Sequence, residues 1–283
     1  MIGAFLLKAL PLHLISGLFG VLAEVRLPKP FNTVVLLIFA KLFGISIGAA
    51  SKPLAAYRSL NEFFTRDLRP EARIIADQGL LSPCDGFLRE AGPVQNGEIR
   101  GVKGQNYTVF ELLGGVAEAS RFQEGVFFNF YLSPRDYHHV HAPATGEITA
   151  RIHIPGSLFP VNAWSLGRIP KLFPRNERVV ILMWTEFGLA AVVMVGATNV
   201  GKITLTFDSL VTNQLRGARS GSEPVRLEFT PGRQIKAGAR LGTFNLGSTV
   251  VLLLESRAIK PLLESNREVL FGQRIGAVVK AAT

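Results

Sequence analysis

The sequence predicts an α+β protein in which an N-terminal group of helices precedes a β-rich antiparallel core with a sandwich or barrel-like arrangement. The first fifty residues are largely apolar, as in helices that bury one face. Beyond Leu80 the chain consists of short runs of β-branched and aromatic residues, broken by glycine and proline. We therefore divide the chain into residues 1–58 and a larger domain, residues 59–283.

The composition indicates which classes of partner this chain can be expected to bind. The 283 residues carry a formal net charge of +10, and 48% of them are hydrophobic against 18% charged. A basic chain favours anionic partners. The basic residues are scattered and form no aromatic-plus-arginine stripe, which argues against nucleic acid. A hydrophobic and basic chain suits the surface of an anionic bilayer better.

The first apolar segment, Met1–Ala23, contains Lys8 and Pro11. Because a charge lies inside the apolar run and no convincing cleavage site follows, the segment is a poor secretory signal. Its unbroken apolar stretch is also short for a membrane span. After Pro11, helical spacing separates polar from apolar side chains, which predicts a helix lying in the membrane plane. The polar face comprises His13, Ser16, Gly17, Gly20 and Glu24, and the apolar arc comprises Leu12, Leu14, Ile15, Leu18, Phe19 and Leu22.

The second apolar segment, Phe31–Ala50, carries Lys41 near its middle and is less clearly amphipathic. An interfacial helix, a helix buried in the core or in an oligomer, and a membrane span all remain open for it. We predict that residues 1–58 associate with a membrane as amphipathic helices on its surface.

The larger domain begins with Ser59–Pro70, which predicts a short helix ended by Pro70. Further helices are predicted at Val109–Leu113 and near Pro261–Arg267. Runs rich in valine, isoleucine and phenylalanine predict strands at six places. These are Val126–Leu132, Val179–Trp184, Ala190–Val195, Ile203–Phe207, Val225–Phe229 and Val250–Leu254.

Two turn sequences resemble each other. Ser82-Pro-Cys-Asp-Gly and Ala142-Pro-Ala-Thr-Gly each place proline second and glycine fifth, before the start of a strand. Proline at the first turn position and glycine where a positive φ is needed would explain both as similar tight turns. Chance similarity of two common turns is the alternative. If the similarity is real, it indicates a duplicated β-sandwich with a pseudo-two-fold axis.

Gly247 and Ser248 lie directly before the apolar run Val250–Leu254. On local evidence they form an ordinary turn into a buried strand. Chemistry offers a second interpretation, since a serine hydroxyl can attack the carbonyl of the preceding residue where the backbone is strained, and glycine permits such conformations. The resulting ester can eliminate to dehydroalanine, which hydrolyses to a pyruvoyl group. Such self-cleavage needs a general base, and the base needs an orienting partner.

Candidates for the base lie in one window. Three of the five histidines of the chain, His138, His139 and His141, fall in Tyr137-His-His-Val-His-Ala-Pro. Histidine is the side chain suited to proton transfer near neutral pH, so the cluster favours a functional role. Asp85, in the Pro-Cys-Asp-Gly turn, is a carboxylate that could orient an imidazole. Its alternative role is a hydrogen bond to the backbone of its own turn.

Several ordered blocks of this chain together resemble the phosphatidylserine decarboxylase family. The resemblance covers the chain from about Leu60 to the C-terminus, whereas Asp208–Arg240 is hard to match. The main blocks are Asn61-Glu-Phe-Phe-Thr-Arg-Asp-Leu-Arg-Pro, Ser82-Pro-Cys-Asp-Gly, Tyr137-His-His-Val-His-Ala-Pro and Leu246-Gly-Ser-Thr, with Phe159-Pro-Val-Asn, Asn176-Glu-Arg and Val195-Gly-Ala-Thr-Asn-Val-Gly between the last two.

The resemblance implies a role for each site residue. Ser248 would be the cleavage nucleophile and the precursor of a covalent pyruvoyl cofactor, with His141 as its general base and Asp85 as the residue that orients His141. His138 would lie near the substrate and handle a proton, and we interpret His139 as structural. The pyruvoyl group would form a Schiff base with phosphatidylserine, and loss of CO₂ would give phosphatidylethanolamine.

The resemblance also implies an assembly and a location. Cleavage between Gly247 and Ser248 would give a β chain, residues 1–247, and an α chain, residues 248–283. These fragments would stay together as a heterodimer, and two such pairs would form a homodimer. Since a diacyl substrate stays in the bilayer, we expect a peripheral or monotopic protein on the cell membrane, with its catalytic domain on the cytoplasmic side.

Two other functions remain open. His139 and His141 have the spacing of zinc ligands on a strand, as in a β-sandwich hydrolase, with His153 or Asp85 as a third ligand. The second alternative is a membrane-bound scaffold or lipid-binding module without activity. Cys84 is the only cysteine, which excludes an intramolecular disulfide and a site of several thiolates. We predict no metal.

Overall fold

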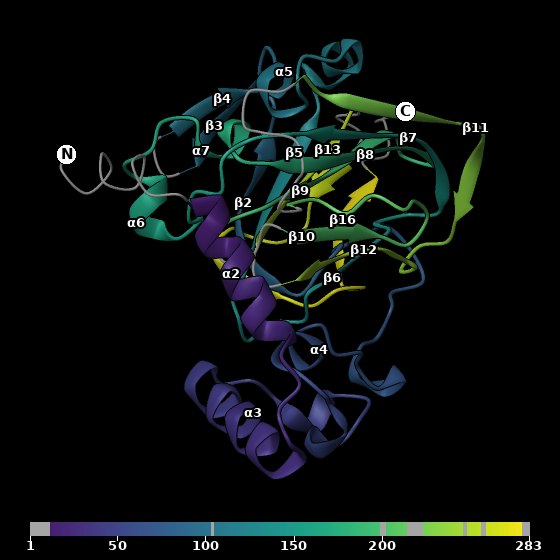
Figure 1. Cartoon of the computed structure of the whole chain (residues 1–283). Coiled ribbons are helices and arrows are strands. Elements are labelled where there is room, and N and C mark those ends of the chain that lie inside the picture. The colour runs from purple at the N-terminus through teal and green to yellow at the C-terminus, as the bar shows by residue number, and fades with distance from the viewer. Residues whose placement is uncertain are drawn as a thin grey trace.

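The computed structural model describes residues 12–102, 105–198, 202–213, 223–245, 248–255 and 259–278. At its centre is an antiparallel sheet that has eight strands within these residues, with smaller sheets on one face and short helices on the other (Figure 1). This arrangement confirms the predicted α+β class with antiparallel strands.

The strands of the large sheet form where β-branched and aromatic residues are densest, and the central strands are buried on both faces. All six predicted strands are present, five of them in this sheet. From edge to edge the order is β11 (Val225–Ile235), β7 (Gly146–Ile154), β8 (Arg178–Thr185), β9 (Gly188–Val195), β13 (Ser248–Leu254), β5 (Val126–Leu132), β2 (Gly86–Pro93) and β15 (Arg267–Val269).

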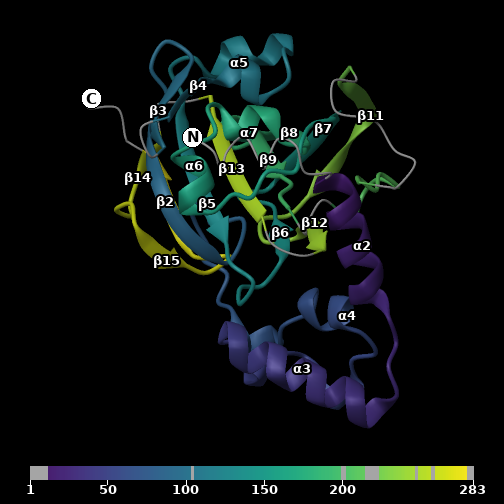
Figure 2. The same cartoon turned by 60° about the vertical axis from the view of Figure 1, so that its left-hand side comes forward.

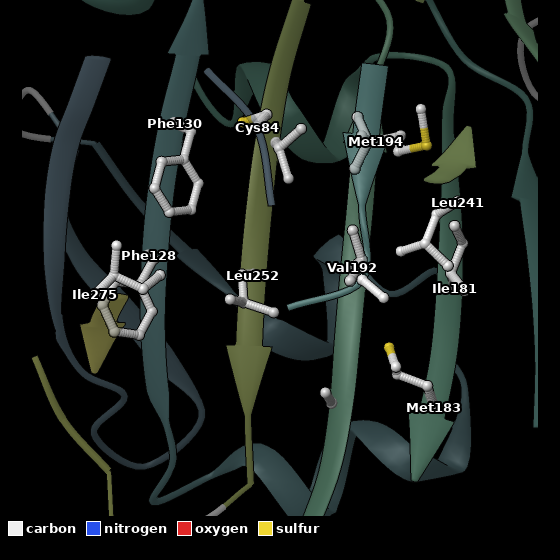
Figure 3. Close-up of a cluster of buried hydrophobic side chains, with 14 of the residues drawn as sticks. Cys84, Phe128, Phe130, Ile181, Met183, Val192, Met194, Leu241, Leu252 and Ile275 are labelled. Carbon is white, nitrogen blue, oxygen red and sulfur yellow. The ribbon is translucent and has the colours of Figure 1, made fainter. Parts of the chain in front are cut away.

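Two small sheets cover one face of the large sheet and enclose the main hydrophobic core, which we call the inner core (Figure 3). Phe128 and Leu252 of the large sheet meet Leu241 and Ile275 of the small sheets there. In the described residues the first small sheet has the order β10 (Lys202–Leu205), β12 (Arg240–Asn245) and β6 (His139–His141), and the second has the order β1 (Leu80–Leu81), β16 (Arg274–Val278) and β14 (Ile259–Pro261).

Short helices and a hairpin cover the opposite face through a second apolar cluster, the outer core. Thr108 begins the first of these helices with a capping box, in which its side chain and that of Glu111 bond each other's backbone N–H. The elements of this layer are α5 (Val109–Leu112), α6 (Ala163–Leu166), α7 (Leu172–Arg175), the 3-10 helix Ala117–Phe122, and the hairpin of β3 (Glu98–Val102) and β4 (Gln105–Thr108).

The N-terminal part is helical, as predicted. α3 lies at the far end of the molecule from the sheets, beyond α4 (Figures 1 and 2). Residues 1–11 and the side chains of residues 12–15, including His13 of the predicted polar face, lie outside the described residues. No helix in the described residues is long and apolar enough to cross a membrane. The elements are α2 (Leu12–Glu24), α3 (Lys29–Phe43), α4 (Leu60–Phe64) and the 3-10 helices Ile47–Ala49, Leu54–Ala56 and Pro70–Ala72.

Helices α2 and α3 each bury one side and expose the other. On α3, Asn32, Leu36 and Ala40 are buried at intervals of four residues, which places them along one side of the helix. On α2, Ser16 of the predicted polar face and Ala23 are buried against the protein, because small residues allow close packing. The outward sides form what we call the apolar surface of α2 and α3. Its members are Leu18, Val21, Leu22, Phe31, Val34, Val35, Leu37, Ile38, Leu42 and Phe43.

The two similar turn sequences lie side by side in the fold. The N–H of Leu81 donates to the carbonyl of Pro143 at 2.8 Å, and the N–H of His141 donates to the carbonyl of Pro83 at 2.7 Å. The proline of each turn therefore accepts a hydrogen bond from the residue just before the other turn, as a two-fold relation requires. The strands β2 and β7 begin directly after the turns. The structure confirms that the two sequences are related turns.

Each turn ends in a glycine for a steric reason. A Cβ at Gly86 would lie 2.5 Å from the carbonyl oxygen of Tyr131, and a Cβ at Gly146 would overlap the carbonyl oxygen of Trp184. Gly86 has a φ of +149°, but Gly146 does not have a positive φ. Close approach of a neighbouring strand, rather than the predicted positive φ, is what the two glycines share.

Two predicted helices differ from the structure. The helix near Pro261–Arg267 is wrong, because β14 ends at Pro261 and β15 begins at Arg267. Asn266 between them has a left-handed φ of 65°, which is incompatible with a right-handed helix. The helix at Ser59–Pro70 is present but ends at Phe64, and Pro70 instead begins a 3-10 helix.

Substitution of Gly146 by alanine should lower the free energy of unfolding by about 1–3 kcal/mol, because the added methyl group must displace the β8 backbone. Gly92→Ala is the matched control, since its Cβ would meet only the Phe127 ring at an ordinary 3.6 Å. Urea unfolding of the two variants measures the difference. Equal stability would contradict the steric explanation.

Candidate active site

The predicted cleavage bond lies where the chain passes from one sheet to another. β12 ends at Asn245 in a small sheet, and β13 begins at Ser248 in the large sheet. Gly247 and the side chain of Ser248 lie outside the described residues. The backbone of Ser248 pairs with Leu132 of β5, and the next residue pairs with β9 on the other side. The N-terminal end of β13 is therefore held between two strands.

The Asp85 turn reaches the same end of the large sheet. Phe87 of β2 pairs with Tyr131 of β5, so the next row contains Gly86, Leu132 and Ser248 on three adjacent strands. Neighbouring strands lie about 4.8 Å apart, which places the Cα atoms of Gly86 and Ser248 about 10 Å apart. The sequence could not reveal this proximity, because it depends on the pairing of strands far apart in the chain.

His138 is fully buried beside β12, where its backbone carbonyl accepts the N–H of Phe244 at 2.9 Å. Its Nδ1–H donates to the carbonyl of Asp136 at 2.8 Å, and its ring lies 4.0 Å from that of Phe64. Burial lowers the pKa of His138 to about 3, so the ring is neutral at physiological pH. Among the described residues, its Nε2 has no hydrogen-bond partner. The proton on Nδ1 leaves Nε2 as an unused proton acceptor.

His141 presents a second unused acceptor. Its Nδ1–H donates to the carbonyl of Gly238 at 2.7 Å, and its ring stacks on Phe271 with centroids 4.0 Å apart. Burial lowers the pKa of His141 to about 4, against the opposing effect of the nearby Asp85 carboxylate. Within the described part of the chain, its Nε2 is also without a partner.

His139 differs from its neighbours because both ring nitrogens are hydrogen bonded. Nε2–H donates to the carbonyl of Thr65 at 3.0 Å, and Nδ1 accepts from the hydroxyl of Thr243 at 2.7 Å. The ring thereby ties β6 to β12 and to the segment after α4. A ring with both nitrogens occupied has no free acceptor for a proton.

Asp85 has other hydrogen-bond partners than the predicted imidazole. The Arg73 guanidinium binds both of its oxygens, and the N–H of Phe271 donates to Oδ1 at 2.9 Å. Phe271 links the two predicted residues, since its N–H binds Asp85 while its ring stacks on His141. Asp85 thus acts on His141 through charge and through Phe271 in this structure. Arg73 was not among the predicted site residues.

The second turn provides a comparison for Asp85. Thr145 occupies the equivalent position, and its hydroxyl accepts the N–H of Ala237 at 3.1 Å. Asp85 therefore makes the backbone bond that this position requires in both turns, but with a charged group paired to Arg73. The negative charge is the feature that distinguishes Asp85 from its counterpart.

Helix α4 supports the site, which the sequence analysis did not predict. Asn61 donates to the side-chain carbonyl of Asn245 at 3.3 Å, next to the predicted cleavage bond. Arg66 donates to the carbonyl of Arg135 at 2.9 Å in the loop before His138. Figures 1 and 2 both show α4 beside the small sheet of β6 and β12. The signal in the sequence was the Asn61 to Arg66 block, to which no role was assigned.

In the residues that the structure describes, no three histidine, cysteine, aspartate or glutamate side chains gather as a metal site would require. His139 in particular has both nitrogens engaged. The arrangement instead offers two neutral imidazoles with unused acceptors and one carboxylate, which suits proton transfer.

Comparison with known proteins assigns a family. Residues 60–277 match the family model described as phosphatidylserine decarboxylase. Proteins named phosphatidylserine decarboxylase proenzyme are similar over most of their length. The relative from Alkalilimnicola ehrlichii is 41% identical, over 90% of this chain and 88% of its own. That from Azotobacter vinelandii is 40% identical over 94% of each chain, and that from Acidovorax ebreus is 39% identical over 93% of each. The chain belongs to the phosphatidylserine decarboxylase family.

Proposed function

We propose that this chain is the precursor of an enzyme that decarboxylates phosphatidylserine to phosphatidylethanolamine, and that it forms a pyruvoyl group by cutting itself between Gly247 and Ser248. The observation that carries this proposal is the pair of buried neutral imidazoles, His138 and His141, whose Nε2 atoms are unused. Their backbones bond the elements on either side of the start of β13: His141 donates to the carbonyl of Pro83 in the Asp85 turn, and His138 accepts the N–H of Phe244 near the end of β12. The names of the relatives support both the substrate and the precursor state.

The strand pairing around Ser248 is compatible with a cofactor made from this residue, the first of β13. After a cut before Ser248, that residue would be the start of a new chain. β13 pairs along its whole length with β5 and over most of it with β9, so the strand would keep its place without the peptide link to β12. The fragments 1–247 and 248–283 would therefore remain a heterodimer. By family resemblance we propose that two such pairs form a homodimer.

Self-cleavage begins when Nε2 of His141 accepts the hydroxyl proton of Ser248. The oxygen adds to the carbonyl carbon of Gly247, and the peptide C–N bond breaks as the serine nitrogen takes up a proton. Loss of the serine Cα proton then expels the Gly247 carboxylate and leaves dehydroalanine, which water converts to the pyruvoyl group and ammonia. Asp85 stabilises the imidazolium that His141 becomes.

Decarboxylation uses the second imidazole. The pyruvoyl group supplies the electron sink for the bond that breaks when CO₂ leaves. His138 handles the proton that goes to the substrate carbon: because its Nδ1–H is fixed on Asp136, Nε2 is the atom that takes up this proton during the reaction and passes it on. One placed acid or base of this kind contributes about 10²–10⁴-fold in rate.

The apolar surface of α2 and α3 supports a membrane location. We propose that this surface lies in the acyl boundary of the membrane and that the net charge of +10 attracts an anionic cytoplasmic leaflet. α4 connects the helices to the site through Asn61 and Phe64. The active site would thereby be held at the height of the lipid headgroup, on a peripheral or monotopic protein of the cell membrane.

Mass spectrometry of the purified protein should show two chains, residues 1–247 and 248–283, the second beginning with a pyruvoyl group. Ser248→Ala should give one uncut chain, because it lacks the nucleophile. Thr249→Val is the matched control and should be cut normally, since the Thr249 hydroxyl has no partner in the described structure. Cleavage of the Ser248→Ala protein at this bond would rule out the mechanism.

Asp85→Thr should slow self-cleavage by about 10²–10⁴-fold, the range expected when a charge is removed from a catalytic relay. The variant copies Thr145, so it keeps an acceptor for the Phe271 N–H but loses the negative charge together with its ion pair to Arg73. Asp85→Asn should behave in the same way. The rate is followed from the fraction of uncut precursor on gels.

Thr145→Val is the control for this series, because it removes the equivalent bond from the other turn and should leave the cleavage rate unchanged. If both Asp85 variants are cleaved at the wild-type rate, the role of Asp85 is structural and its charge does not assist self-cleavage.

Replacing Ile38 and Leu42 of α3 by aspartate should weaken binding to vesicles of phosphatidylglycerol and phosphatidylcholine by at least about tenfold per residue, since each buried aliphatic side chain is worth about 1.5–3 kcal/mol. Sedimentation with the vesicles measures this. Ile74→Asp is the control, because Ile74 is also strongly exposed but lies outside α2 and α3. If the α3 variant binds the vesicles as tightly as the wild type, this surface does not contact the membrane.

A further inference from the structure

Glu177 is a buried carboxylate that takes no part in the reaction proposed above. It lies directly before β8 and is 3% exposed. Its Oε1 accepts from Nε2 of His153 at 2.9 Å and from the N–H of Asn213 at 3.4 Å. Its Oε2 is buried and has no hydrogen-bond partner among the described residues. A buried polar atom without a partner is costly, so its retention calls for a reason.

Within the described structure no arginine or lysine pairs with Glu177, and His153 can match its charge only when that ring is protonated. Arg178 is adjacent in sequence, but its guanidinium donates to backbone carbonyls, among them that of Leu112 at 2.7 Å and that of Glu111 at 2.7 Å. Asp85, which is equally buried, is paired with Arg73. A buried carboxylate of this kind favours a cation as its partner.

Glu177 lies in the same row of the large sheet as the predicted cleavage site. The N–H of Gly196 donates to the carbonyl of Glu177 at 2.8 Å, and Val195 before it pairs with Thr249. The row therefore runs from Glu177 through Gly196 to Ser248. At about 4.8 Å per strand, the Cα atoms of Glu177 and Ser248 are about 10 Å apart. Gly196 between them has no side chain.

Charged groups thus flank β13 on both sides of this row. The Asp85 turn and its arginine lie two strands away in one direction, and Glu177 lies two strands away in the other. The side with Asp85 is electrically neutral because Arg73 is bound to it. On the side with Glu177, the described residues place His153 but no arginine or lysine against the carboxylate, and the unsatisfied Oε2 suits one further N–H donor.

We propose that Glu177 binds the primary ammonium group of the phospholipid headgroup, an inference that rests on the proposed function. An ammonium has three N–H donors, and one of them would satisfy Oε2. His153 and Asn213 hold Oε1 and so keep the carboxylate in place. Glu177 would select headgroups that carry an amine over anionic headgroups without one.

The test measures binding apart from turnover. The full-length cleaved protein is treated with borohydride, which reduces the pyruvoyl ketone to an alcohol and prevents covalent capture of amines. Calorimetry then compares dihexanoyl phosphatidylserine with dihexanoyl phosphatidylglycerol, which lacks the ammonium. Glu177→Gln should weaken binding of the serine lipid by about 10–100-fold, as expected for loss of a charged hydrogen bond. Binding of the glycerol lipid should not change.

Two variants complete the design. Glu228→Gln makes the same substitution on the exposed edge strand β11 and should bind both lipids like the wild type. Glu177→Asp keeps the charge and should retain part of the preference for the serine lipid. If Glu177→Gln does not fold or is not cleaved, Glu177→Asp decides the question, because a shorter carboxylate must still weaken binding of the serine lipid selectively.

The outcomes separate this inference from the function on which it rests. A wild-type protein that is not cut, or that has no carbonyl to reduce, refutes the proposed function. A cleaved wild type whose Glu177 variants keep the full preference, or lose affinity for both lipids equally, overturns the role of Glu177 alone.

Discussion

The position of β13 between β5 and β9 is the constraint on which the rest of the structure depends. Its residues pair with both neighbours, and its side chains alternate between the inner and outer cores. A strand anchored in this way can lose a covalent link at its start and stay in register. The same pairing defines the row that brings the Asp85 turn to one side of Ser248 and Glu177 to the other.

Burial sets the chemistry at this end of the sheet. His138 and His141 each donate one ring N–H to a backbone carbonyl, which fixes the tautomer and leaves the other nitrogen as an acceptor. Because desolvation lowers the pKa of both rings to about 3 and 4, they remain neutral bases well below physiological pH. In a solvated loop the same side chains would be partly protonated. The tight core therefore keeps both rings unprotonated, although each is a weaker base than a solvated imidazole.

The sequence was most informative where local composition decides the structure. Val126–Leu132 is apolar except for Asn129 and the hydroxyl of Tyr131, and it forms a strand that is almost entirely buried. Pro261–Arg267 has no such signal, and pairing with β16 and β2 decides its structure instead. Ser248, His138, His141 and Asp85 could be selected from their motifs. Arg73 and Glu177 could not, because their importance depends on partners that only the fold brings to them, Asp85 for Arg73 and His153 for Glu177.

The alternation of β6 shows why one window can contain three histidines with different surroundings. His139 and His141 share a face of the strand, where both rings contact Tyr137. Val140 on the opposite face belongs to the inner core, and His138 contacts Phe64 of that same core. The two imidazoles with unused acceptors therefore lie in separate environments. Under the proposed mechanism, such a separation would allow one base to serve the single event of self-cleavage while the other remains available for every turnover.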